Sequence, residues 1–229
     1  MLDGACHIKR LIKAAAKQKM PAIAITDHGN MFGVIEFYDA AMKGGVKPIV
    51  GCEVYVAPGS RFEKGMSGIK ENYYHLVLLC KDGVGYKNLV KIVSAGYLEG
   101  FYYRPRIDKE FLRAHSEGLI CLSACLRGEV ARAFLFDDEK KALAAALEYQ
   151  EIFGKENFYI EIQDHGLEEQ ARANKRLIAL SKEANIPLVA TNDVHYITQD
   201  MAEAHDALLC IGTQTTLDNP NRLKYYTIV

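Results

Sequence analysis

Six short apolar runs recur along the chain, separated by longer segments in which apolar residues follow helical spacing. The runs are AIAIT (22–26), PIVGCEVYV (48–56), HLVLLC (75–80), LICLS (119–123), FYIEI (158–162) and PLVAT (187–191). Each is rich in Val, Ile and Leu and is short enough to be a strand buried on both faces. The pattern therefore predicts six buried strands.

Helical spacing is clearest at 8–16, 142–153 and 170–184, where apolar residues three and four positions apart share one face. Strands that alternate with helices predict parallel βα units, in either an open doubly wound sheet or a barrel. The order of elements does not choose between these two. The chain opens directly into a helical segment, so we expect a seventh strand upstream of Met1. The stretch 57–72 is expected to be a surface loop, and LKYYTIV (223–229) has the composition of a strand.

Composition narrows the class of protein. The 229 residues are 49% hydrophobic and carry 28 Lys and Arg against 29 Asp and Glu, so any basic surface for nucleic acid must be local. No apolar stretch reaches the roughly 18 residues of a membrane helix, and the polar start lacks the apolar core of a signal peptide. The six cysteines form no CxxC pair. We expect a cytoplasmic α/β protein with reduced cysteines and no membrane partner.

Residues that can bind metals or carry protons stand at or near several of the apolar runs. In α/β sheets and βα barrels, the ends of the strands form the ligand site. Carboxylates, imidazoles and a thiolate together suit Zn, Mn or Fe, whereas Mg or Ca prefers oxygen alone. The residues that follow runs are Asp27, His28, Cys125, Asp164, His165, Asp193 and His195. Glu53 lies within the second run, His75 opens the third, and Asp3 precedes the first helical segment.

Backbone geometry limits which neighbours can act together. Alternate residues of an extended segment face the same way, so Asp193 and His195 can point at one site, while Asp27 and His28 cannot both do so. We assign His28 to the metal and Asp27 to a supporting position behind it. A single Asp or His at a strand end is usually a cap, and Asp193 could cap a helix beginning near Thr198. Several such residues at one edge favour a metal site.

Other catalytic motifs are absent from the sequence: it has no GxxxxGK[ST], GxSxG or GxGxxG. The aromatic and basic stretch GYLEGFYYRPRID (96–108) could stack bases and bind phosphates through Arg104 and Arg106. It could equally be a surface loop held by tyrosine packing and an Arg–Asp pair.

Several longer segments resemble one family closely. AITDHGNMFGVIEFYDAAMKGGVKPIVGCEVYV, FYYRPRIDKEFL, LICLSACLRGEV, YIEIQDHG and LVATNDVHY resemble the polymerase and histidinol phosphatase (PHP) domain found at the N-terminus of bacterial DNA polymerase III alpha subunits. The resemblance implies a distorted (β/α)₇ barrel over residues 1–229, here missing its first strand, with the palm and later polymerase domains absent. The chain is then N-terminally truncated and should not polymerise DNA.

The resemblance also implies a set of metal ligands for up to three divalent ions. A leading His-x-His of the family has no counterpart in this sequence and would lie before Met1. The positions that match the family pattern are Asp3, His28, Glu53, His75, Cys125, Asp193 and His195. Of these, His28, Asp193 and His195 are expected to be catalytic.

The resemblance further implies that the chain is a metal-dependent phosphoesterase. It would remove nucleotides from a primer 3′ end as a 3′–5′ proofreading exonuclease. The implied partners are DNA, the rest of the alpha subunit, and the proofreading epsilon subunit and sliding clamp of the holoenzyme. One alternative is a non-catalytic module that stabilises the polymerase and docks a proofreading subunit. Another is a free-standing phosphatase acting on small molecules.

Overall fold

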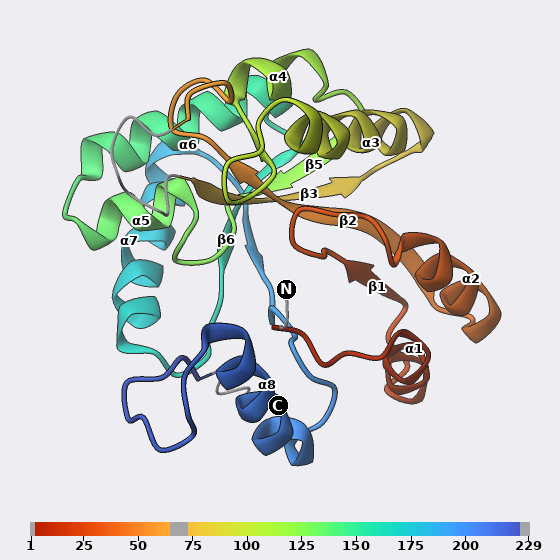
Figure 1. Ribbon diagram of the computed structural model, residues 1–229. Coiled ribbons are helices and arrows are strands. Elements are labelled where there is room, and N and C mark those ends of the chain that lie inside the picture. Colours follow the sequence, from red (N-terminus) through yellow and green to blue (C-terminus); the bar gives the residue numbers. More distant parts are fainter. Residues whose placement is uncertain (1–2, 65–72, 225–229) are drawn as a thin grey trace.

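A curled sheet lies at the centre of the computed structural model, which describes residues 3–64 and 73–224 (Figure 1). The elements in chain order are α1 (Ile8–Lys17), β1 (Ala22–Ile25), α2 (Val34–Gly44), β2 (Lys47–Val56), β3 (Tyr74–Cys80), α3 (Gly83–Leu98), β4 (Arg106–Ile107), α4 (Lys109–Ala114), β5 (Leu119–Leu122), α5 (Glu129–Leu135), α6 (Glu139–Phe153), β6 (Phe158–Ile162), α7 (Glu168–Ala184), β7 (Leu188–Ala190), the 3₁₀ helix η1 (Gln199–Met201) and α8 (Ala202–Thr213). All six predicted strands are present, and the two-residue β4 is one that the apolar pattern does not predict.

The strand order is β1-β2-β3-β5-β6-β7, with β4 paired to β2 off this path. Neighbours β1 and β2, β5 and β6, and β6 and β7 are parallel. Strand β3 is antiparallel to both β2 and β5, so the expectation of parallel units throughout is wrong for this strand. Its reversal places the start of β3 at the edge where the other strands end.

The sheet curls into an open half barrel, which confirms the mixed α/β barrel-like class (Figure 1). Within the described ranges, β1 pairs only with β2, and β7 pairs only with β6. The two ends of the sheet therefore face an opening beside the N-terminal segment.

Three helices begin at aspartates that follow strands or turns. Asp82 accepts hydrogen bonds from the backbone N–H of Val84 and Gly85, and thereby starts α3. Asp108 and Asp138 do the same for α4 and α6. A carboxylate at this position satisfies backbone donors that have no partner within the helix, so these residues set where the outer helices begin.

Apolar packing joins the helices to the sheet through two separate cores. The main core lies between the sheet and helices α3 to α7, with Leu78, Leu89 and Phe158 fully buried. A second core, which contains Ile12 and Phe37, joins α1 and α2 to the sheet. None of the described helices is long and apolar enough to cross a membrane.

Two sequence predictions fall partly outside the described ranges. Residues 57–64 form the beginning of the expected loop, and 65–72 lie beyond the description. Most of LKYYTIV, from 225 on, also lies outside it.

Candidate metal centre

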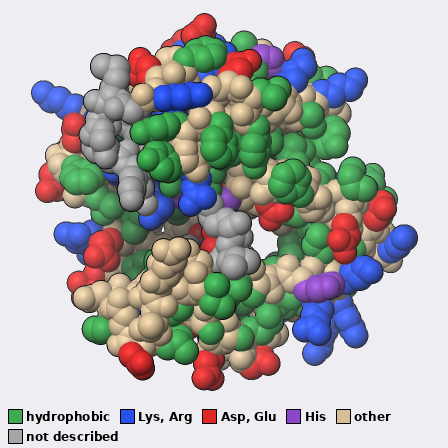
Figure 2. All heavy atoms as spheres, viewed as in Figure 1, with side chains coloured by type: hydrophobic (Ala, Val, Ile, Leu, Met, Phe, Trp, Pro, Cys, Tyr) green, Lys and Arg blue, Asp and Glu red, His purple; other side chains and the backbone are tan. Residues whose placement is uncertain are grey.

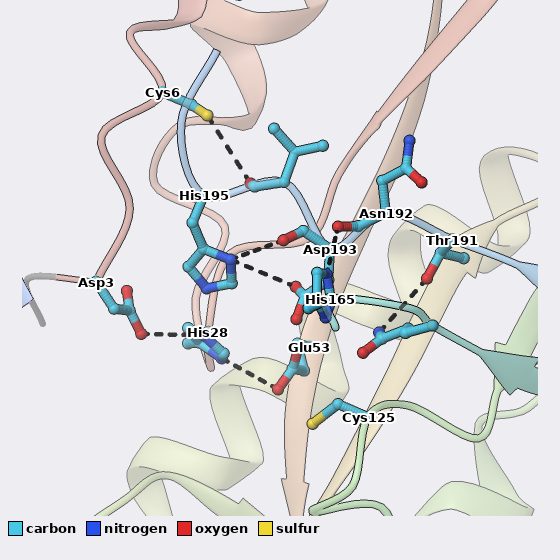
Figure 3. A network of polar contacts seen from close by, with 12 residues as sticks. Asp3, Cys6, His28, Glu53, Cys125, His165, Thr191, Asn192, Asp193 and His195 are labelled. Carbon is cyan, nitrogen blue, oxygen red and sulfur yellow. Dashed lines mark hydrogen bonds and ion pairs between the residues drawn. The ribbon is translucent and has the colours of Figure 1, made fainter. Parts of the chain in front are cut away.

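Six of the predicted ligand residues lie close together in Figure 3 (Asp3, His28, Glu53, Cys125, Asp193 and His195), and the seventh, His75, contacts Glu53 and Cys125. His28 follows β1, Glu53 lies near the end of β2, and His75 is at the start of the reversed strand β3. Bridges between His28 and Glu53 and between His75 and Gly128 tie this edge to the turns around it. The chain therefore gathers ligands from its whole length at one place.

One triad of ligand atoms consists of Asp3, His28 and His195, whose ligand atoms all lie within 4.8 Å of one another. His28 Nε2 lies 3.1 Å from Asp3 Oδ2. The rings of His28 and His195 have centroids 6.4 Å apart. Two imidazoles and a carboxylate at this spacing are a donor set that Zn, Mn or Fe accepts.

A second triad consists of His28, Glu53 and His75, again with ligand atoms within 4.8 Å. His28 Nδ1 lies 3.2 Å from Glu53 Oε1, and His75 Nδ1 contacts the same oxygen. Cys125 Sγ extends the cluster, at 3.6 Å from His75 Nδ1. His28 belongs to both triads, because its two ring nitrogens face Asp3 and Glu53 respectively.

Asp193 and His195 lie close together, but not through the extended alternation that the sequence predicted, because β7 ends at Ala190 and Asp193 has a left-handed backbone. His195 Nδ1 lies 2.7 Å from the Asp193 carbonyl and 3.8 Å from its carboxylate. A bond from Nδ1–H to this carbonyl makes Nε2 the unprotonated atom of the neutral ring. Asp193 belongs to neither triad found in the described chain; its carboxylate lies beside His195 in Figure 3.

Left-handed backbone recurs at the turns that carry these ligands. Gly29, directly after His28, has φ +65°, Ala124, directly before Cys125, has φ 63°, and Asp193 itself has φ 44°. Such angles are rare for residues other than glycine and cluster at functional sites. A Cβ on Gly29 would lie 2.8 Å from Pro105 Cγ and 2.9 Å from Tyr55 Cε2, so glycine is required to hold His28 in place.

Opposite charges dominate the electrostatics of the cluster. Burial alone would raise the pKa of Glu53, but hydrogen bonds from His28 and His75 hold it well below its usual range. Burial alone would lower the pKa of His28, but Asp3 and Glu53 together raise it to about 10. Burial raises the pKa of Asp193, and His195 only partly offsets this effect. The cluster is thus an ion-paired set of His and carboxylate groups that a cation can reorganise.

The buried donor atoms fit a divalent metal. Among the described residues, His75 Nε2 is buried without a hydrogen bond, and buried polar atoms in proteins rarely lack a partner. Glu53 Oε1 lies against both His28 Nδ1 and His75 Nδ1, so three donor atoms meet at one buried place. Burial and the nearby Glu53 carboxylate raise the pKa of the Cys125 thiol. That thiol would lose its proton on binding a metal.

Asp27, for which the sequence predicted a supporting role, contacts its neighbours chiefly through its backbone carbonyl. Its carbonyl accepts the Glu53 N–H at 3.1 Å and the Cys52 thiol at 3.2 Å. Burial raises the pKa of its carboxyl group. Asp27 therefore fixes β1 against β2 through its backbone.

Arg106 is not placed to bind a phosphate directly. It is 1% exposed, and its guanidinium donates to the carbonyls of Gly100 at 3.2 Å and Glu63 at 2.8 Å. The prediction of a phosphate contact is corrected for this residue, because those carbonyls occupy its donors. Arg104 lines the cavity at the metal centre and lies over the Tyr55 ring, 5.8 Å from its centroid.

Three further residues lie around the centre; His165 was among the sequence candidates, whereas His205 and Glu161 were not. His165 Nε2 bonds to the Asn192 carbonyl at 2.8 Å, next to Asp193. His205 Nε2 bonds to the Asp3 carbonyl at 2.6 Å. Glu161 is 3% exposed and contacts Thr191. His165 stands after a strand and could be suspected from the sequence, whereas His205 lies within helix α8 and gives no such indication.

A cavity of about 1110 Å³ opens beside the triads, lined by candidate site residues such as His28 and Asp193 and by apolar residues such as Val77 and Leu122. Figure 2 shows the molecule hollowed near the middle of this view. The volume is large enough for a ligand of drug size or greater.

Comparisons with known proteins place these features in context. The family described as PHP domain matches residues 1–165. The DNA polymerase III subunit alpha of Treponema pallidum (strain Nichols) is 47% identical over 227 residues, which are 99% of this chain and 19% of that protein. The chain thus spans about a fifth of the length of this curated relative.

Solved structures share the fold at low sequence identity. An amidohydrolase from Chromobacterium violaceum, solved with bound sulfate and no metal, has TM-score 0.55 and 14% identity, and the match covers 90% of this chain and 93% of that one. A two-domain protein from Bacteroides vulgatus, described as containing a predicted PHP-like metal-dependent phosphoesterase, has TM-score 0.52 and 16% identity, over 88% of this chain and 52% of that one. These two likenesses concern the fold alone.

Proposed function

Because this chain belongs to the PHP-domain family, we propose that it is a metal-dependent phosphoesterase module of a DNA polymerase III alpha subunit. Its activity would be 3′–5′ exonuclease proofreading. One observation carries the proposal: two triads of possible ligand atoms share His28, and the buried His75 Nε2 beside them has no hydrogen-bond partner. Asp3, His28 and His195 would hold one ion, and Glu53 and His75, with Cys125, would hold another.

Divalent ions in such sites activate water and stabilise the charge that develops on the leaving oxygen. The side chains of this protein supply the rest. Asp193, which lies beside His195, is placed to orient the attacking group, and His165 fixes the turn that carries it. Arg104 at the cavity wall is placed to contact a phosphate of the DNA.

The proposal is tested on the full 229-residue chain loaded with Mn²⁺ or Zn²⁺. The substrate is a primer–template with a mismatched, labelled 3′ nucleotide. We expect removal of that nucleotide by the parent chain and by a His7→Ala variant, since His7 is an exposed histidine at the start of α1. The His28→Ala and Asp193→Ala variants should be inactive. Equal release by the parent and His28→Ala would contradict the proposal.

The non-catalytic alternative is favoured by the ion pairs that already join the ligands, because such a cluster could serve stability alone. In that case chelation would lower the melting temperature, and no nuclease activity would be lost. A platform role would centre on docking the rest of the alpha subunit, the epsilon subunit and the clamp. These partners, and a cytoplasmic location, are proposed from the polymerase relatives.

Metal identity follows from the donor set. We propose Zn, Mn or Fe, because imidazole and thiolate donors accompany the carboxylates. The Cys125→Ser variant should lose affinity for Zn²⁺ more than for Mn²⁺, since sulfur prefers the softer ion. Cys80→Ser is the matched control, at the opposite end of β3 from His75. Equal losses for the two metals would mean that Cys125 is not a ligand.

We also propose that residues 1–229 form one PHP domain whose barrel accepts a further strand between β1 and β7. The support is that each of these strands has one paired neighbour among the described residues. An N-terminal extension that supplies a strand with His-x-His should raise both the melting temperature and the metal affinity. An extension that changes neither would contradict this proposal.

A further inference from the structure

Four aromatic side chains surround the mouth of the cavity above the metal centre. Phe32 precedes α2, Tyr97 lies on α3, and Phe101 and Tyr103 lie in the loop between α3 and β4; all four line the cavity. They are unusually exposed for large apolar side chains, at 86% for Phe32, 42% for Tyr97, 49% for Phe101 and 58% for Tyr103. We name these four residues the aromatic rim.

Local contacts and backbone conformation fix the positions of the rim side chains. The Tyr97 and Phe101 rings stack, with centroids 6.2 Å apart. Tyr103 has φ 58°, a left-handed conformation that is an outlier for a bulky residue. Tyr102 N–H donates to the Arg104 carbonyl at 3.0 Å and closes the turn around Tyr103. This turn presents the Tyr103 ring outward at a conformational cost.

A row of stacked groups connects the rim to the metal centre. The Arg104 guanidinium lies over the Tyr55 ring, and the Tyr55 ring stacks on His28 with an interplanar angle of 13° and centroids 6.3 Å apart. His28 is the residue shared by the two triads. The rim and His28 thus line the same cavity and are joined by a chain of ring contacts.

The charges indicate what such a ligand is. The floor of the cavity is acidic, with Asp3, Glu53 and Asp193, and Arg104 is the one Lys or Arg among the described residues that line it. A ligand held chiefly through phosphates would need more cations, as in the basic grooves that follow a nucleic-acid backbone. A ligand with flat π faces, which can stack on the exposed rings, suits this surface better than one held chiefly through phosphates.

We infer that the aromatic rim binds the unpaired bases of a single-stranded nucleic-acid 3′ end and directs its terminal phosphodiester to the metal centre. The inference rests on the proposed function and deepens it by assigning the residues that hold the unpaired bases of the substrate. Bases of a duplex are stacked and paired with one another, so their faces cannot reach the separate rings of the rim. A frayed or mismatched end offers those faces.

The test is binding of a fluorescein-labelled eight-nucleotide oligothymidylate with a 3′-terminal phosphorothioate linkage, which resists hydrolysis, followed by anisotropy in constant Mn²⁺. The Phe101→Ala, Phe32→Ala and Tyr103→Asn variants should each bind about tenfold more weakly, as expected for the loss of one stacking ring. Asparagine is chosen at Tyr103 because it tolerates the left-handed backbone. Phe101→Tyr should restore binding.

The control is Phe136→Ala, which removes a ring that is 73% exposed at the end of α5 and should bind like the parent. The salt dependence should also be shallow, with a slope of log K against log salt of about −1, because one arginine contacts the backbone. A blunt duplex of the same length should bind much more weakly than the single strand. Melting temperatures of all variants check that they are folded.

Rim variants that bind the oligothymidylate as tightly as the parent would overturn the inference, and so would a parent that prefers the blunt duplex. Hydrolysis of bis(4-nitrophenyl) phosphate by the Mn²⁺-loaded parent is measured alongside. Its absence would contradict the proposed function, while the anisotropy comparison would still decide the role of the rim.

Discussion

Glu53 and His75 contact each other across two antiparallel strands, although β1, β5, β6 and β7 give the sheet its parallel character. In the β2–β3 register, Tyr55 is paired with His75 and Glu53 with Val77, so the carboxylate and the imidazole are diagonal neighbours on the same face. A parallel β3 would have carried His75 to the opposite edge of the sheet. The reversal of one strand therefore completes the second triad.

The Glu53→Gln variant should be destabilised and should bind metal weakly. The carboxylate is the shared partner of His28 and His75, and removing one member of a buried ion pair costs about 3 kcal/mol. Denaturant unfolding in the presence of a chelator at pH 6.5 measures this loss, and calorimetric titration with Mn²⁺ should show at least a tenfold weaker affinity. Glu36→Gln, an exposed residue on α2, is the control; an equal loss in both variants would contradict the assignment.

The metal-free chain should become less stable as pH rises above neutrality. Asp3 and Glu53 raise the pKa of His28 to about 10, whereas an unfolded histidine has a pKa near 6.5. The stabilisation by the charged ring is therefore complete below pH 6.5 and is lost as pH rises toward 10.

Between pH 7 and pH 8.5 the free energy of unfolding should fall by about 1 kcal/mol, because each pKa unit corresponds to about 1.4 kcal/mol and partial exposure screens the pair. Urea titrations with a chelator at the two pH values measure the difference. The His28→Asn variant should show a flatter profile. A parent whose stability is constant over this window would refute the coupling.

Gly29→Ala should disturb the metal centre, while Gly45→Ala should not. Both glycines have left-handed backbone, with φ +65° and φ +71°, but only Gly29 has atoms within 4 Å of the added Cβ. Each substitution should cost about 1 to 2 kcal/mol from the backbone alone. The added contact with Tyr55 and Pro105 should further displace His28, so only Gly29→Ala should lose Mn²⁺ affinity. The same metal affinity in both variants would show that the close packing is unimportant.

Substitution of Arg106 should lower stability, whereas substitution of Arg104 should weaken nucleic-acid binding. Arg106→Met removes buried hydrogen bonds to the carbonyls of Gly100 and Glu63, and we expect a loss of about 3 kcal/mol in unfolding free energy. Arg104→Ala should keep the melting temperature and weaken binding to single-stranded DNA. Thermal unfolding and anisotropy measure the two effects. If Arg106→Met were as stable as the parent, the account of its buried guanidinium would be wrong.

The sequence alone located the strands well because apolar runs of five to nine residues report burial directly. Strand β6 has the predicted bounds, Phe158–Ile162, and the other predicted strands differ by a residue or two at their ends. The direction of β3 could not be obtained in this way. Apolar periodicity is the same for parallel and antiparallel strands, and the chain between Val56 and Tyr74 is long enough for either connection.

Candidate ligands were recognisable from the sequence where a histidine follows a strand end, as for His28, which belongs to both triads, whereas Asp193 was named in the same way and belongs to neither. Residues such as His205 that support the site could not be recognised from the sequence, because their roles depend on contacts between distant segments. His205 reaches the Asp3 carbonyl across 202 positions. Arg106 shows the reverse error: its place in an aromatic and basic stretch resembled a phosphate site, and only packing reveals that backbone carbonyls surround its guanidinium.

The most direct test of the central claim is Mn²⁺ binding by electron paramagnetic resonance, which distinguishes bound from aqueous Mn²⁺, on the parent and the His28→Ala variant. Since His28 belongs to both triads, the account predicts protein-bound Mn²⁺ in the parent and loss of most of that signal in the variant. A parent that binds no Mn²⁺, or a His28→Ala variant that binds as much as the parent, would contradict it.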